Sequence, residues 1–125
     1  MSTFQPEGRH TVTPRIMTPD VGGLVQFLKS VFDARGDRRV GAPTEITIGD
    51  STILVSDGGG LRPTSQAFLY VYVEHADETY LRAIELGAQG IEPPQDMPYG
   101  DRRAMIRDAW GNLWQIATHL GATKG

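Results

Sequence analysis

One pattern of predicted elements occurs twice in this chain of 125 residues. In each copy an apolar strand is followed by an amphipathic helix and then by strands in which apolar and polar residues alternate. A copy of about 55 residues is too short to bury a sheet face alone. We therefore predict one structural domain in which two such modules each place one helix behind a sheet, while the spare faces of the two sheets form a cup.

The predicted boundaries follow from this repeat. The first module spans residues 11–57 and the second spans residues 67–119. Residues 58–66, GGGLRPTSQ, are predicted to form the linker, because glycine, proline and serine favour connecting segments. Residues 1–10 and 120–125 remain as an N-terminal and a C-terminal tail.

The first module begins with a predicted strand over residues 11–18, in which Val12 and Ile16 are expected to point into the core despite the interruption at Pro14. Asp20 is expected to cap a helix that ends near Gly36. A hairpin follows within residues 43–59 and turns at Gly49 and Asp50. The apolar residues with helical spacing are Val21, Leu24, Val25, Phe27, Leu28, Val31 and Phe32.

The second module repeats this order with a strand over residues 67–74, a helix over 76–87, a short edge segment over 88–94 and a hairpin over 102–119. The helix is expected to end at Gly87. Its apolar side is expected to contain Tyr80, Leu81, Ile84 and Ala88.

Composition excludes several classes of function. A net charge of −3 and a pI near 5.5 argue against nucleic-acid binding, which requires clustered Lys and Arg. The absence of a long apolar window and of a signal-like N-terminus predicts a cytoplasmic protein that does not insert into a membrane. The absence of cysteine removes disulfides, thiolate nucleophiles and thiolate metal ligands.

The order of these motifs resembles the vicinal oxygen chelate superfamily, which includes glyoxalase I, bleomycin-resistance proteins and extradiol dioxygenases. The segments that carry the resemblance are IMTPDVGGLVQFLKSVFDARG, IGDSTILVSD, YVEHADETYLRAIELGA and IRDAWGNLWQIATH, and they cover nearly the whole chain. Ala109 departs from the proline that is usual in the last turn. The resemblance implies an α+β fold of two βαβββ modules in tandem. Within the superfamily, the sequence resembles a glyoxalase-like branch whose members often lack a full metal site.

The turn DAWGN predicts the register of the last hairpin. If Asp108 pairs with Asn112, Ala104 and Ile106 share the buried face with Trp114 and Ile116. The opposite face, which forms part of the cup, then contains Arg103, Met105, Arg107, Leu113, Gln115 and Ala117. The same alternation assigns Phe68, Tyr70, Tyr72, Thr13, Arg15, Met17, Thr52, Leu54 and Ser56 to the cup.

The resemblance implies four metal-ligand positions, which fall at Thr13, Leu54, Phe68 and Gln115. Only Gln115 offers a plausible ligand, whereas a catalytic divalent site needs about three. We therefore expect no metal and no cofactor. The predicted ligand-binding residues are Thr13, Leu54, Phe68, Tyr70, Tyr99, Arg103, Met105, Arg107 and Gln115, with Tyr99 as a lid residue in a long loop.

The remaining polar residues permit structural and functional interpretations. Arg103 and Arg107 either clamp an anionic ligand or lie at an exposed edge or a dimer contact. Asp101 is expected to pair with arginines at the surface and Asp108 to cap its turn. His119 shares the parity of Gln115 and can reach the rim of the cup.

Three hypotheses follow. The first is a homodimeric glyoxalase/bleomycin-resistance-like protein that sequesters a small planar or anionic molecule without metal. The second is a glyoxalase-like lyase or isomerase, or a dioxygenase-type enzyme, with an atypical active site, so that whether the chain is an enzyme stays open. The third is an interaction module whose open sheet face is only a dimer interface.

Overall fold

The computed structural model describes residues 4–58 and 64–121, and the chain divides into two compact units, Met1–Ser65 and Gln66–Gly125. Parts of the predicted linker, 59–63, and of the predicted tails, 1–3 and 122–125, lie outside the described residues. That the two units form one structural domain stays a prediction. No helix in the described ranges is long and apolar enough to cross a membrane.

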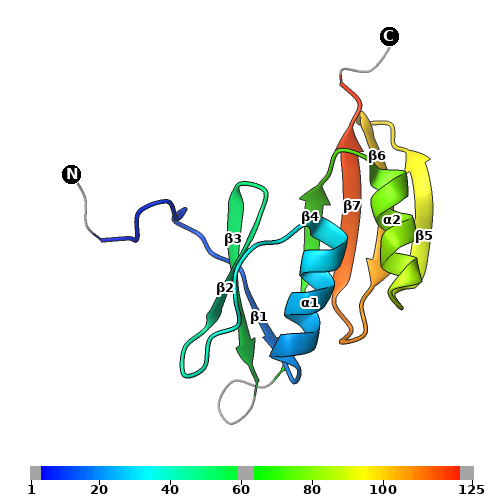
Figure 1. Ribbon diagram of the computed structural model, residues 1–125. Helices are drawn as coiled ribbons and strands as arrows, with labels where there is room; N and C mark the ends of the chain where they lie inside the picture. Colours follow the sequence, from blue (N-terminus) through cyan, green and yellow to red (C-terminus); the bar gives the residue numbers. More distant parts are fainter. Residues whose placement is uncertain (1–3, 59–63, 122–125) are drawn as a thin grey trace. The chain divides into compact units, whose positions relative to one another are not determined.

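The first unit contains β1 (Arg15–Thr18), α1 (Val21–Phe32), β2 (Thr44–Ile48) and β3 (Ser51–Asp57) (Figure 1). Its sheet has the order β1-β3-β2, with β1 parallel and β2 antiparallel to β3. The Asp20 carboxylate accepts a hydrogen bond from the backbone N–H of Gly23 and so caps α1, as predicted. The seven apolar residues predicted for this helix are all buried.

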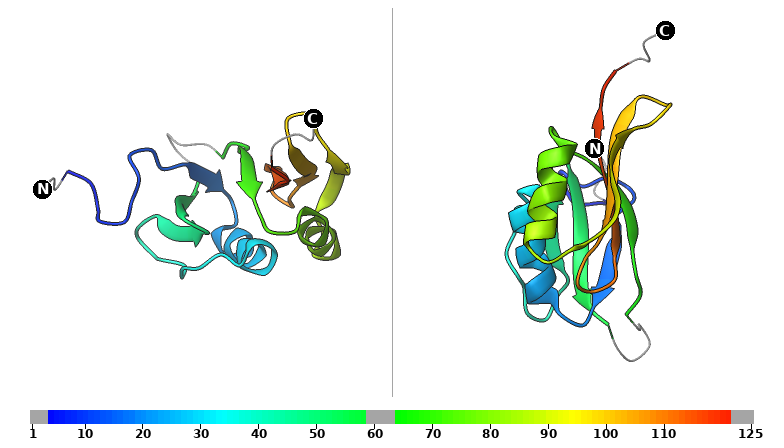
Figure 2. Two further views of the ribbon diagram at one scale, coloured as in Figure 1. Left: turned by 90° about the horizontal axis from the view of Figure 1, so that it is seen from above. Right: turned by 90° about the vertical axis from the view of Figure 1, so that its right-hand side faces the viewer.

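The second unit contains β4 (Phe68–Tyr72), α2 (Ala76–Glu85), β5 (Gln89–Asp96), β6 (Asp101–Arg107) and β7 (Leu113–His119). Its sheet has the order β4-β7-β6-β5, with β4 parallel to β7 and the other neighbours antiparallel. Figure 2 shows each helix along one face of the sheet of its own unit. Trp114, Ile116, Ala104 and Ile106 are fully buried in the core of this unit.

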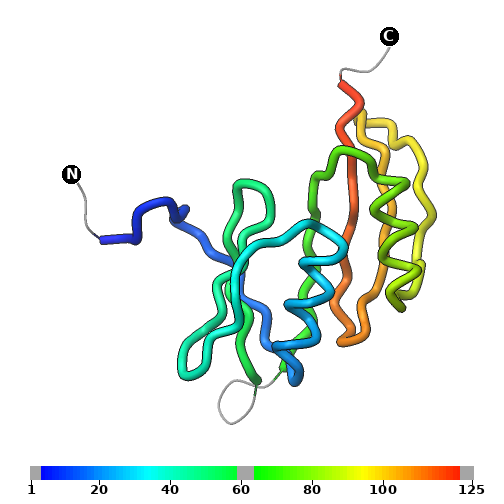
Figure 3. The backbone as a smooth tube through the Cα atoms, viewed as in Figure 1, coloured from blue at the N-terminus to red at the C-terminus, as the bar shows by residue number. Residues whose placement is uncertain are grey.

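The first sheet has one strand fewer than the second. After α1 the backbone returns toward β2 as a long irregular segment (Figure 3), and the single bridge between Arg35 and Thr47 is its only ladder contact among the described residues. The α+β arrangement of two modules, each with one helix behind a sheet, is as predicted.

Some local predictions were wrong. Val12 is exposed because β1 begins only at Arg15, after the proline that cannot donate to the ladder. The first helix ends at Asp33, which adopts the left-handed conformation with φ 55°, and not near Gly36. In α2, Leu81 is exposed and Ala83 is buried instead.

The predicted edge segment over residues 88–94 forms a longer strand, β5. It tolerates Pro93 and Pro94 because it lies at the edge of the sheet and its pairing with β6 shifts register twice. The second hairpin, by contrast, has the predicted strands.

Candidate functional site

The turn between β6 and β7 is held by one buried carboxylate. Asp108 Oδ1 accepts hydrogen bonds from the backbone N–H groups of Trp110 and Asn112, each at 2.9 Å. Asp108 Oδ2 accepts from the Asn112 side-chain amide at 3.0 Å and from Trp114 Nε1 at 2.9 Å. This cap pairs Asp108 with Asn112, confirming the register predicted from DAWGN.

The register places the predicted side chains in rows across the face of the second sheet that is turned away from α2, here called the open face. Phe68, Leu113 and Arg107 form the first row. The second row contains Tyr70, Gln115 and Met105, and the third contains Tyr72, Ala117 and Arg103. Neighbouring strands lie about 4.8 Å apart, so the rings on β4 and the side chains on β6 flank Gln115 on both sides.

Three aromatic side chains along β4 are exposed on this face. Their exposed fractions are 62% for Phe68, 38% for Tyr70 and 61% for Tyr72. The two tyrosine rings make an edge-to-face contact with centroids 5.4 Å apart. Much of the apolar surface of these rings is therefore not buried in the core of the unit.

A buried carboxylate organises the end of the open face. Asp101 is only 2% exposed, and its Oδ2 accepts hydrogen bonds from the hydroxyls of Tyr70 at 2.6 Å and Tyr72 at 2.9 Å. Its Oδ1 lies 2.9 Å from Nδ1 of His119. The small side chain of Ala117 on the intervening strand lets the tyrosine hydroxyls reach across to Asp101. Asp101 pairs with no arginine among the described residues, so the structure does not bear out that expectation.

These hydrogen bonds shift the ionisation of all three partners. The hydrogen bond from Tyr70, and then that from His119, lowers the pKa of Asp101. Burial, and then the hydrogen bond to Asp101, raises the pKa of Tyr70, while for Tyr72 the hydrogen bond is the main cause of a raised pKa. Asp101 is therefore an anion that orients two neutral phenols and one exposed imidazole.

Arg103 is half-buried and already engaged. It donates to Glu92 at 2.9 Å and to the hydroxyl of Tyr99 at 3.1 Å, and that hydroxyl also lies 3.4 Å from the hydroxyl of Tyr70. Its Nε is buried without a partner among the described residues. Tyr99 therefore lies beside Arg103 and Tyr70, two of the other predicted ligand-binding residues, and its hydroxyl contacts both.

Arg107 and Gln115 make fewer polar contacts than Arg103 within the described residues. Arg107 donates to the side-chain oxygen of Gln89 at 3.3 Å and forms no ion pair within the described part of the chain. The Gln115 amide is half-buried and has no hydrogen bond to any described residue. An amide and a guanidinium on the open face therefore remain available to a ligand.

The structure brings together seven of the nine predicted ligand-binding residues in the second unit. Thr13 and Leu54 belong to the first unit, where Leu54 pairs with Arg15 on the sheet and Thr13 precedes β1. Neither Asp101 nor Glu92 was predicted to be a site residue. The alternation that placed Arg103 on the open face places Asp101 there too, but nothing in the sequence marked it as buried beneath two tyrosines.

The residues at the four positions that the resemblance implies for metal ligands do not fit a metal ion. Leu54 and Phe68 carry no donor atom, Thr13 offers a neutral hydroxyl, and Gln115 offers one amide oxygen. Among residues 4–58 and 64–121, no group of three or more His, Asp or Glu side chains can hold a metal ion.

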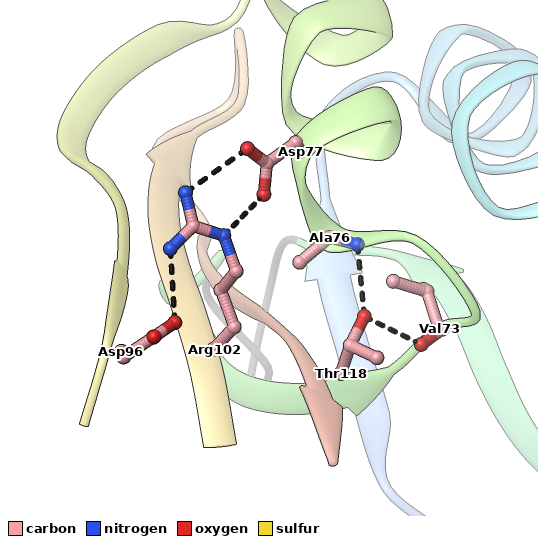
Figure 4. A network of polar contacts seen from close by, with 6 residues as sticks. All are labelled: Val73, Ala76, Asp77, Asp96, Arg102 and Thr118. Atoms are coloured by element: carbon pink, nitrogen blue, oxygen red, sulfur yellow. Dashed lines mark hydrogen bonds and ion pairs between the residues drawn. The ribbon is translucent and has the colours of Figure 1, made fainter. Parts of the chain in front are cut away.

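The helix-covered side of the second unit uses its polar groups for structure (Figure 4). Arg102 donates to Asp77 on α2 at 2.7 Å and to Asp96 on β5 at 2.9 Å. The hydroxyl of Thr118 donates to the Val73 carbonyl and accepts from the Ala76 N–H. The hydrogen bond from Arg102 lowers the pKa of Asp77. These contacts fasten the start of α2 to the sheet.

Comparison with known proteins gives one consistent result. The family model described as Glyoxalase/Bleomycin resistance protein/Dioxygenase superfamily matches residues 9–116. An uncharacterized protein of Mycobacterium bovis is 24% identical over 122 residues, covering 84% of this chain and 80% of that protein.

Two solved structures illustrate the shared fold. TioX from Micromonospora sp. ML1 has a TM-score of 0.72 and 25% identity, covering 92% of this chain and 100% of its own. The fosfomycin resistance protein FosX from Mesorhizobium loti has a TM-score of 0.65 and 22% identity, covering 91% and 93%. The predicted α+β fold of tandem modules is confirmed by this likeness. The chain belongs to the glyoxalase/bleomycin resistance protein/dioxygenase superfamily.

Proposed function

We propose that this chain is a binding protein of the glyoxalase/bleomycin-resistance type, which sequesters a small planar or anionic organic molecule on the open face of the second sheet without a metal. One observation carries the proposal. Three aromatic rings lie exposed in a line beside Gln115, an amide with no hydrogen bond to any described residue. Exposed rings and an uncommitted amide are the groups that a planar polar ligand would satisfy.

The chemistry of the face supports this ligand class. A planar molecule lying against Phe68 and Tyr70 would bury apolar area at roughly 25 cal/mol per Å². The Gln115 amide would donate to or accept from a polar edge of the ligand, and it can do both. Arg107, which has no ion pair within the described residues, would take a carboxylate or phenolate.

A metal-free mode of binding is part of the proposal. It is supported by the donor-poor residues Thr13, Leu54 and Phe68 at the positions where the family holds its metal. We also propose that the protein is a cytoplasmic homodimer and that nucleic acid and membranes are not its partners.

The test uses 1-naphthoate as a planar anionic probe in a fluorescence titration of the metal-free protein. We expect saturable binding that Gln115→Leu and Phe68→Ala each weaken by about tenfold, the loss expected for one good hydrogen bond or stacking contact. Gln26→Leu is the matched control, because Gln26 is an exposed amide on α1 and does not belong to the second sheet. Equal losses in all three variants, or no saturation, would contradict the proposal.

A second candidate function rests on the Asp101–His119 pair. An exposed imidazole whose Nδ1 is held by a buried carboxylate has the arrangement of a general acid or base. This favours a lyase or isomerase with an atypical site.

Metal analysis combined with a methylglyoxal–glutathione assay separates the two functions. The binding proposal predicts substoichiometric metal and no turnover. Turnover that His119→Ala abolishes, while naphthoate binding persists, would establish the enzyme instead.

The third hypothesis, that the open face is only a dimer interface, has its own signature. Sedimentation analysis of Phe68→Asp would show dissociation to monomers if Phe68 were buried between subunits. The binding proposal predicts that this variant keeps the oligomeric state of the wild type and loses the probe.

A further inference from the structure

A cavity of about 370 Å³ lies in the first unit, where β3 ends and β2 and α1 begin. All of its lining residues belong to the first unit, whereas the residues of the open face belong to the second. Its volume falls within the range of small-molecule sites. The polar lining consists of Arg15, Arg38, Arg39, Thr44, Ser56 and Asp57, and the rest is apolar or glycine.

Two buried hydroxyls at the cavity are set to donate. Ser56, which is 9% exposed, accepts a hydrogen bond from Nε of Arg15 at 3.1 Å. Thr44, which is 1% exposed, accepts from the backbone N–H of Arg39 at 2.9 Å. Each oxygen has thus accepted a hydrogen bond, and neither O–H donates to any residue that the structure describes. Both hydroxyls can therefore donate a hydrogen bond to an acceptor on a bound ligand.

The charge at the cavity is an excess of cations. Arg15 and Arg38 form no ion pair within the described residues, whereas Arg39 shares Glu45 with Arg9. The one carboxylate in the lining, Asp57, is exposed. Three guanidinium groups and one carboxylate leave a net positive lining.

Arg38 is held close to the start of α1. Its Nη1 lies 3.4 Å from the position that a Cβ on Gly22 would occupy, so the guanidinium rests against the first helical turn. The positive end of the helix dipole adds to the potential there. A cation without an ion pair at the positive end of a helix is unfavourable by itself, and an anion would relieve it.

We propose that this cavity binds the phosphate group of a small organic phosphate. A carboxylate offers two oxygens, whereas a phosphate monoester offers three terminal oxygens and a larger charge, which suits three guanidinium groups and two hydroxyls. The apolar lining, which includes Val21 and Val55, would contact the organic part of the ligand. The inference goes beyond the proposed function, since it concerns residues of the first unit and a phosphate group in particular.

The test is an NMR titration of the full chain at constant ionic strength with phenyl phosphate, inorganic phosphate and benzoate as probes. We expect phenyl phosphate to give saturable shifts in the backbone amides of residues 38–42, 44 and 55–57. Arg38→Gln should weaken its binding by about tenfold or more, as expected for a charge-assisted contact. Arg35→Gln is the matched control, because Arg35 is an exposed arginine of the same unit that donates to the Gly49 carbonyl and does not line the cavity.

The three probes distinguish the sources of the anion. Tighter binding of phenyl phosphate than of inorganic phosphate supports an organic phosphate, and equal binding would assign the site to free phosphate. Benzoate binding as tightly as phenyl phosphate would overturn the proposal, as would the absence of saturation. Equal losses in Arg35→Gln and Arg38→Gln would also overturn it, because they would indicate general screening.

Discussion

The buried cap of the last turn gives the sharpest test of how the site is positioned. In Asp108→Asn one oxygen can still accept from the backbone N–H groups of Trp110 and Asn112. An amino group then replaces the second oxygen and faces two further donors, Trp114 Nε1 and Asn112 Nδ2, which lie 2.9 Å and 3.0 Å from it. Both donors lose this acceptor in a buried environment.

The expected loss follows from these two contacts. Leaving one buried donor without its acceptor costs about 1–3 kcal/mol. The indole loses this acceptor, whereas the Asn112 amide keeps a contact of 3.3 Å with the remaining oxygen, so Asp108→Asn should lower the free energy of unfolding by roughly 1–4 kcal/mol. Urea denaturation followed by circular dichroism measures this loss. Asp50→Asn is the matched control, since Asp50 is an exposed turn residue that accepts one exposed hydrogen bond from Ser51, and its change should stay within about 0.5 kcal/mol.

A double-mutant cycle isolates the contact with the indole. Trp114→Phe removes the Nε1 donor, so in that background Asp108→Asn should cost about 1–3 kcal/mol less than in the wild type. A loss below about 0.5 kcal/mol in the single variant, or a coupling energy near zero, would refute the reasoning that this carboxylate sets the hairpin register.

Three further predictions concern the buried acid, the phenols and one glycine. The hydrogen bond from Tyr70 lowers the pKa of Asp101 below its usual 3.8, so the carboxylate stabilises the fold above pH 3.8 and that stabilisation is lost as the pH falls through the lowered value. The difference in unfolding free energy between wild type and Asp101→Asn should shrink in acid, and a difference independent of pH would contradict this. Because the pKa values of Tyr70 and Tyr72 are raised, tyrosinate absorbance just above pH 10.0 should be the same in the wild type and in the variant with both replaced by phenylalanine; a smaller signal in the variant would show that they ionise normally. Gly36→Ala should lower the melting temperature, because Gly36 has φ +131° and an added Cβ would overlap the backbone oxygen of Glu45; an unchanged melting temperature would exclude that overlap.

Much of the fold was predictable because local signals agree with one another. The apolar spacing after Asp20 predicts a helix and the turn at Gly49 predicts a hairpin. The structure confirms both. The register of β6 and β7 was predictable for a similar reason, since a slip by one residue would have mixed arginines with Trp114 in the core.

The polar contacts of the site were less predictable, since they depend on non-local packing. Asp101 is buried only because two tyrosines on β4 reach across β7, a contact between residues about thirty positions apart. Arg103 was predicted either to clamp an anionic ligand or to lie at an exposed edge or a dimer contact. In the structure it donates a hydrogen bond to Glu92 on the neighbouring strand, which neither alternative included. The shifted register of β5 sets that contact, and no simple alternation encodes it.

The central claim, that the open face of the second sheet binds a small planar molecule, is tested most directly by locating the probe. An NMR titration of the metal-free protein with 1-naphthoate maps its backbone amide shifts. We predict that the largest shifts fall on β4 and β7, around Phe68, Tyr70 and Gln115, and that Gln115→Leu reduces them. Shifts confined to other parts of the chain, or binding that appears only after a divalent metal is added, would contradict the claim.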